Sequence, residues 1–146
     1  RAGRIPGHKV RELRWVRMSE ETDAEIAIWN RACLVDEFTP TFPGDVALRR
    51  AISFHGIACN GGVTHSLQFH VKELPDIFDA FRFIGASELP GLLTSFSEQY
   101  ASASQEERSK SERSFDQQYA AAISDRQLND LFLATYRSNP AAFAPA

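Results

Sequence analysis

Hydrophobic positions recur at helical spacing along most of this chain, and nowhere does an alternating pattern hold long enough to require a sheet. The clearest case is Leu89, Leu92, Leu93, Phe96 and Tyr100, which follow the i, i+3, i+4, i+7, i+11 pattern of an amphipathic helix. A chain of 146 residues is most simply one domain. The pattern therefore predicts an all-α fold, a single compact domain of about six or seven helices.

The first helices are predicted from capping residues and prolines. Ser19 is a suitable N-cap because acidic residues follow it in the first turn, where they favour the helix dipole. That helix is expected to end near Phe38, since Pro40 and Pro43 cannot continue it. A second apolar face runs over residues 48–59 and predicts the next helix.

The sequence Asn60-Gly61-Gly62 is interpreted as the corner on which the fold turns. Either glycine can adopt the backbone conformation that closes a helix without steric penalty. Residues 64–71 are ambiguous between helix and strand, and the helical neighbours favour a helix. Residues 75–85 are apolar on nearly every side, which predicts a helix in the centre of the core that stops at Gly85.

The second half of the chain is also predicted to be helical. Residues 102–114 carry no large apolar side chain and form either a solvated loop or the exposed start of a helix. Ser124 and Gln127 have the spacing of a capping box, which starts the last helix, and Pro140 ends it.

Charge is distributed unevenly between the two parts of the chain. Residues 1–17 carry six basic and one acidic side chain, a net charge of +5, whereas residues 18–146 have a net charge of −8. We therefore divide the chain into a basic N-terminal extension, residues 1–18, and a helical domain, residues 19–146. Such an extension is more often a solvated tail than a contact for an anionic partner, and we do not expect direct nucleic-acid binding.

The densest acidic region extends from Glu20 to Asp45, with seven carboxylates and one Arg. It is either a solvated helix face or a surface that imitates nucleic-acid phosphates and binds a basic protein. The candidate partner-binding residues are Glu20, Glu21, Asp23, Glu25, Asp36 and Glu37.

Histidine and cysteine positions raise two chemical hypotheses. His55 and Cys59, four residues apart, can share one helix face and one metal ion if His65 or His70 folds back as a third ligand. The spacing matches no common zinc pattern, so a buried histidine beside a free thiol is favoured. Cys59 is disfavoured as a nucleophile because a helix C-terminus raises a thiol pKa. We predict no metal, no cofactor and no catalytic residue.

The compartment is inferred from the cysteines and the hydropathy. Cys33 and Cys59 lie in apolar helical patterns and form no disulfide framework, which favours the cytoplasm. No apolar run approaches the roughly 20 residues that cross a bilayer, so no membrane association is expected.

Four sequence blocks, taken in order, carry a family resemblance. They are Asn60-Gly61-Gly62, Phe83-Ile84-Gly85-Ala86, Phe115-Asp116-x-x-Tyr119, and Leu128-x-x-Leu131 followed by Tyr136-x-x-Asn139-Pro140-x-x-Phe143. Over roughly residues 20–143 the chain resembles the DMP19-like family, a bacterial DNA-mimic protein domain that is also classed as a domain of unknown function. The resemblance implies an all-helical domain without catalytic activity or cofactor. It also implies a DNA-binding protein as partner, since a family member imitates the charge of DNA and sequesters a transcription factor.

The sequence thus predicts a non-enzymatic protein-interaction domain that binds a protein partner, a basic DNA-binding protein among the candidates, through acidic helix faces. The alternative is a small metal-dependent or hydrolytic enzyme centred on the Asn-Gly-Gly corner, with His55, Asn60 and His65. The sequence does not predict the oligomeric state.

Overall fold

The computed structural model describes residues 21–34 and 36–146, and over these residues the chain is helical with no strand. The all-α prediction is therefore confirmed. The α-helices are α2 (Asp23–Cys33), α3 (Pro43–Gly61), α4 (Val63–Phe69), α5 (Leu74–Phe83), α6 (Leu89–Ser102), α7 (Gln105–Ala122) and α8 (Asp125–Ser138). Two short 3-10 helices, η1 (Val71–Glu73) and η2 (Pro140–Ala142), complete the fold. No helix among the described residues is long and apolar enough to span a membrane.

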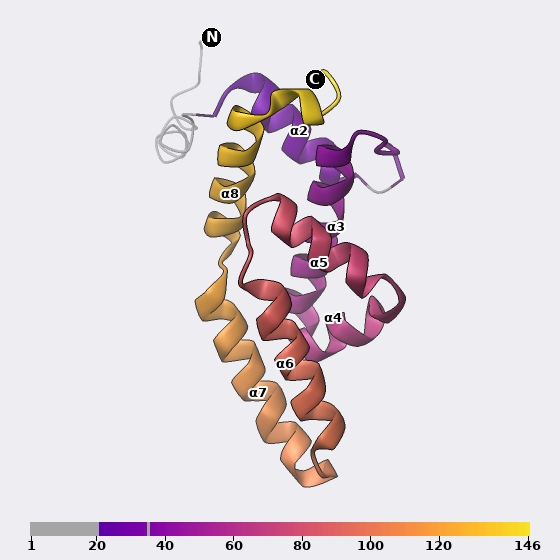
Figure 1. The fold of residues 1–146 in the computed structure, drawn as a ribbon, viewed down its shortest axis with the longest axis vertical. Coiled ribbons are helices and arrows are strands. Elements are labelled where there is room, and N and C mark those ends of the chain that lie inside the picture. Colours follow the sequence, from indigo (N-terminus) through magenta and orange to yellow (C-terminus); the bar gives the residue numbers. More distant parts are fainter. Residues whose placement is uncertain (1–20, 35) are drawn as a thin grey trace, which may run out of the picture.

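The fold is elongated, with α3 running through its middle (Figure 1). Helix α3 packs against α2, α4 and α5, while α6 and α7 form an antiparallel pair at one end of the molecule. Helix α8 continues from α7 towards the other end, where it brings the C-terminal residues next to α2. Residues far apart in the sequence therefore meet at the α2 end.

Phe54 of α3 lies in the centre of the larger hydrophobic core. Its side chain is fully buried and packs edge-on against Phe81 of α5, with ring centroids 5.8 Å apart. Phe96 of α6 stacks on Phe115 of α7 at 4.4 Å, which joins the α6–α7 pair to the same core. Aromatic side chains from four helices thus form one contiguous interior.

A second, smaller core lies at the α2 end. Ile28 of α2, Leu48 of α3 and Phe132 of α8 are fully buried there, and Phe143 closes the cluster after η2. The ring of Phe143 lies so close to Gly44 that a Cβ at this position would sit 2.6 Å from it. The absence of a side chain at Gly44 therefore allows the C-terminal segment to pack on α3.

Three predicted details of the helices are wrong. The first described helix is capped by Thr22, whose side chain and that of Glu25 bond reciprocally to backbone N–H groups, and it ends at Cys33, not near Phe38. Ser19 lies outside the described residues. Helix α5 is buried on the face of Ile77 and Phe81, whereas Phe83 on another side is 37% exposed, so the helix is not in the centre of the core.

Other predicted details are confirmed. Residues 63–69 are helical, and residues 102–114 contain the exposed start of α7. Ser124 and Gln127 form the predicted capping box at the start of α8.

Gly62 is the corner residue. It separates α3 from α4 with φ +98° and ψ 151°, a conformation that residues with a side chain rarely adopt. The first amide of α4, that of Val63, donates to Asp116 Oδ1 of α7 at 2.9 Å. A carboxylate far along the chain thus satisfies an amide that the tight corner leaves without a partner within its own helix.

We predict opposite effects for two glycine substitutions in and after α3. Gly62→Ala is expected to lower the free energy of unfolding by about 1–3 kcal/mol, because alanine must adopt a strained φ. Gly56→Ala is the matched control: its Cβ meets nothing within 4 Å, and it should gain up to about 1 kcal/mol of helix propensity. Urea unfolding measures the free energy of unfolding of both variants. Equal changes in the two variants would contradict the requirement for glycine at position 62.

Candidate functional site

The six predicted partner-binding residues do not all lie on one accessible surface. Asp23, Asp36 and Glu37 are exposed around the two ends of α2, and Glu21 is half-buried. One carboxylate oxygen of Glu21 accepts a hydrogen bond from Asn129 Nδ2 of α8 at 2.8 Å. Glu20 lies outside the described residues.

Glu25 has an internal role. Its side chain is 3% exposed, and Arg137 of α8 donates from Nε to Oε2 at 2.8 Å and from a terminal nitrogen to Oε1 at 2.9 Å. The Arg137 hydrogen bonds hold the pKa of Glu25 below its ordinary value, although burial opposes this effect. Glu25 therefore joins α2 to α8. It is not presented to a partner, although its place in the acidic region predicted that role.

A second buried ion pair fixes the C-terminal segment. Asp45 is fully buried, and Arg31 bonds to it from two nitrogens, with Nε 3.1 Å from Oδ1. The other oxygen of Asp45 accepts the backbone N–H of Ala144 at 2.8 Å, and Arg31 also donates to the carbonyl of Ala144. This pair ties α2, α3 and the segment after η2 together.

Arg49 closes the C-terminus of α2. Its guanidinium donates to the carbonyls of Arg31, Ala32 and Leu34, at 3.2, 2.9 and 2.9 Å. The last carbonyls of a helix lack their usual intrahelical donors, and here a guanidinium from α3 bonds to them beside the backbone N–H of Leu34, which donates to the carbonyl of Arg31. Arg31, Arg49 and Arg137 are thus all engaged by internal acceptors.

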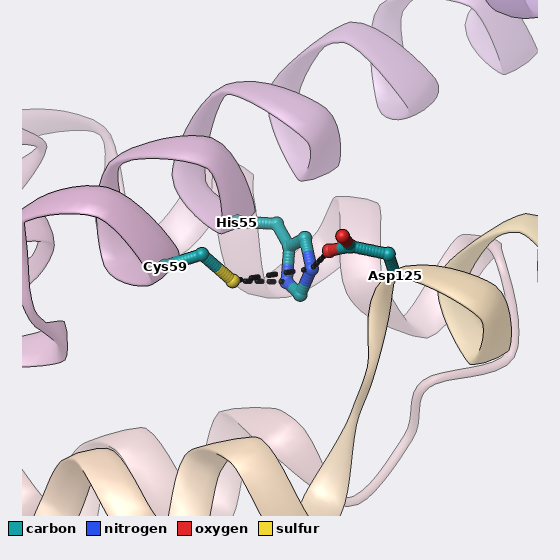
Figure 2. A group of neighbouring side chains, drawn as sticks. All are labelled: His55, Cys59 and Asp125. Carbon is teal, nitrogen blue, oxygen red and sulfur yellow. Dashed lines mark hydrogen bonds and ion pairs between the residues drawn. The ribbon is translucent and has the colours of Figure 1, made fainter.

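The strongest chemical cluster lies where α3 passes the start of α8 (Figure 2). His55 is buried, with Nδ1 2.8 Å from the hydroxyl of Tyr119 and Nε2 2.8 Å from Asp125 Oδ1. The sulfur of Cys59 lies 3.4 Å from Nε2 and 3.9 Å from Nδ1. In one neutral tautomer Nε2–H donates to Asp125 while Nδ1 accepts from Tyr119, so both ring nitrogens are satisfied.

This arrangement differs from a nucleophilic triad. In such a triad the nucleophile and the carboxylate contact opposite nitrogens of the imidazole. Here the carboxylate bonds to Nε2, and Nε2 is also the nitrogen nearest to the sulfur of Cys59. Burial, and then the charge of Asp125, raises the pKa of the Cys59 thiol, which leaves it protonated and a poor nucleophile.

The histidines that the sequence offered as further ligands lie elsewhere. His70 is buried between Ser53 Oγ, 3.2 Å from its Nε2, and the backbone carbonyl of Ser66, 3.1 Å from its Nδ1. His65 is exposed and packs beside Phe69. Asn60 is also exposed and donates to the carbonyl of Gly56.

Asp125 and Tyr119 were missed as partners of His55. Both lie more than 60 residues further along the chain, so no local spacing connects them to His55. The only usable signal was the capping box at Ser124, which places Asp125 in the first turn of α8.

Comparison of this chain with family models, with curated proteins and with solved structures finds no match. The resemblance to the DMP19-like family therefore stays a prediction from the sequence blocks. Those blocks have structural roles here, since Asp116 bonds at the corner and Tyr119 bonds to His55.

We predict that Glu25→Gln lowers the stability in a pH-dependent way. At pH 7 the loss should be about 1–3 kcal/mol, because the ion pair to Arg137 loses its charge. The folded-state pKa is depressed, so the carboxylate contributes fully above its unfolded pKa. The difference between wild type and variant should narrow as the pH falls below the ordinary value of 4.5.

Urea unfolding between pH 3 and 7 measures this difference, with the exposed Glu106→Gln as control. A difference that is constant over the whole range would refute the assignment of Glu25.

Tyr119→Phe is expected to cost about 1–2 kcal/mol, because it leaves the buried Nδ1 of His55 without its donor. Tyr100→Phe also removes a hydrogen bond, the one to Glu112 at 2.7 Å, but from a half-exposed position. Water can replace that bond, so the loss should stay below about 1 kcal/mol. Chemical denaturation compares the two, and equal losses would argue against a buried Tyr119–His55 bond.

Proposed function

We propose that this chain is a non-enzymatic interaction domain that binds a basic surface of a protein partner through the carboxylates around α2. The observation that carries this proposal is the internal engagement of Arg31, Arg49 and Arg137 by buried or backbone acceptors. Among the described residues no ion pair is formed by Asp23, Asp36 or Glu37. We call these three exposed carboxylates the α2 acidic surface.

Charge on an exposed surface acts mainly by attracting and orienting a partner. Exposed carboxylates lose little hydration until a partner arrives, and their attraction for a cationic surface raises the rate of encounter. Screening limits this attraction to about 8 Å at physiological ionic strength. Binding through the α2 acidic surface should therefore be strongly dependent on salt.

A DNA-binding protein is the partner class that this chemistry suits best. Its cationic surface is built to receive a row of phosphates, and carboxylates on a rigid helical frame offer similar charges. The frame around α2 is held by the two buried ion pairs and by Arg49, so the exposed carboxylates are attached to a packed end of the molecule. The family resemblance supports the same class of partner.

An enzyme at the Asn-Gly-Gly corner is less well supported. An open groove of about 430 Å³ does lie beside α3, lined by residues that include Asn60, His65 and Cys33. His55 is not among its lining residues, since its ring is directed towards Tyr119 and Asp125. The three side chains of this alternative, His55, Asn60 and His65, therefore do not share one cavity.

We predict that reversing the charge of Asp23, Asp36 and Glu37 to Lys together weakens binding to immobilised basic DNA-binding proteins roughly tenfold or more. The control reverses three other exposed carboxylates, Glu73, Glu98 and Glu106. The control variant has the same net charge as the test variant. It also places a lysine in the first turn of a helix, α7, as the test variant does in α2. Glu25 is left unchanged in both, because its loss destabilises the fold.

Surface plasmon resonance at several salt concentrations measures both variants, with duplex DNA added as a competitor. We expect DNA to displace the chain and the control variant to retain its affinity within about threefold. Binding that is insensitive to salt, or equally weakened by both triple substitutions, would be incompatible with the proposal.

A further inference from the structure

Three side chains with metal-binding atoms meet between α3 and α8. The ligand atoms of His55, Cys59 and Asp125 all lie within 4.8 Å of one another. We propose that these three residues form a binding site for one Zn²⁺ ion. The sequence predicted no metal because it offered only His65 or His70 as the third ligand, and the fold supplies Asp125 instead.

The spacing of the donors is close to that of a tetrahedral zinc site. Bonds of about 2.0–2.3 Å at tetrahedral angles place two ligand atoms about 3.3–3.6 Å apart. The distance of 3.4 Å between Cys59 Sγ and His55 Nε2 lies in this range. The 2.8 Å between Nε2 and Asp125 Oδ1 is a hydrogen bond and must open slightly. The Asp125 side chain is 91% exposed, so a small rotation suffices.

The ring of His55 is already held in the orientation that an ion requires. Its Nδ1 is fixed by the hydroxyl of Tyr119 at 2.8 Å, and Nε2 is directed towards Asp125 (Figure 2). The sulfur of Cys59 lies beside the ring, 3.4 Å from Nε2 and 3.9 Å from Nδ1, and must turn towards Asp125 to reach an ion on Nε2. When Nε2 binds the ion, the ring proton resides on Nδ1 and is donated to the oxygen of Tyr119. Zinc-bound histidines commonly have such a partner on the second nitrogen. Cys59 binds as the thiolate and releases its proton to solvent.

The site is open to solvent on one side. Cys59 and Asp125 are both exposed, while His55 is buried beneath them. An ion can enter without unfolding the helices, and a water molecule can complete the fourth position. The bound ion would cross-link α3 to the first turn of α8.

The donor set selects the type of ion. One thiolate, one imidazole and one carboxylate suit Zn²⁺ and its substitute Co²⁺, whereas Mg²⁺ and Ca²⁺ prefer oxygen ligands alone. We therefore expect the site to discriminate against Mg²⁺ present in excess.

Titration of the full chain with Co²⁺ and Zn²⁺ tests the proposal. We expect one Co²⁺ per chain with a thiolate-to-cobalt charge-transfer band and the visible spectrum of a tetrahedral site, and displacement of Co²⁺ by Zn²⁺. Cys59→Ser and Asp125→Asn should each weaken Zn²⁺ binding roughly tenfold or more in isothermal titration calorimetry. Both side chains are exposed, so the variants should keep the circular dichroism spectrum of the wild type.

Two matched controls alter a thiol and an imidazole outside the cluster. Cys33 and His65 are exposed, and Cys33→Ser and His65→Gln should leave the affinity and the charge-transfer band unchanged. Absence of saturable binding would overturn the proposal. So would a charge-transfer band that survives Cys59→Ser or disappears in Cys33→Ser.

Discussion

The reversal of the chain at Gly62 is the constraint on which most of the structure depends. One residue separates two helices, so the chain has no loop in which the first amide of α4 could meet water or a capping side chain. Glycine makes the required φ of +98° accessible, and Asp116 of α7 supplies the acceptor for Val63. The corner and α7 are therefore mutually dependent: α4 is capped only if α7 is docked. The docking of α7 also places Tyr119, one turn beyond Asp116, against His55 on α3. The orientation of the buried His55 ring therefore depends on the same helix that caps the corner.

Arginines determine which carboxylates remain on the surface. A count of charges along residues 20–45 treats every Asp and Glu alike, yet burial separates two buried carboxylates from three exposed ones, while Glu21 is half-buried. Glu25 and Asp45 are buried against Arg137 and Arg31, where the loss of either partner would leave an uncompensated charge. Asp23, Asp36 and Glu37 stay in water. The buried carboxylates of the acidic region therefore hold neighbouring helices together, whereas the exposed ones form a charged surface. Only the exposed carboxylates are available for electrostatic recognition.

Local sequence predicted most helices and little of the sites. Periodicity located the helical segments. The capping box at Ser124 and the pair Gly61-Gly62 located two boundaries, because caps and turns depend on residues only a few positions apart. The start of α2 was predicted from Ser19, whereas Thr22 caps the helix. Its end was missed because the C-terminus is closed by Arg49 from another helix. The exposure of Phe83 was missed because an apolar pattern does not show which apolar faces pack against a neighbouring helix. Asp125 and Arg137 could not be foreseen, since their partners are brought near only by tertiary packing.

Helix α8 relates the two proposed sites to each other. Its first residue, Asp125, bonds to His55, and near its end Arg137 holds Glu25 of α2. A helix of 14 residues is about 21 Å long, more than twice the distance over which exposed charges act at physiological salt. An ion at His55, Cys59 and Asp125 would therefore not directly neutralise Asp23, which lies two residues before Glu25 at the far end of α8. Its effect would be mechanical, since it would fix the start of a helix whose end is already anchored. The acidic surface and the metal site thus rest on separate physical grounds, and the failure of one leaves the other intact.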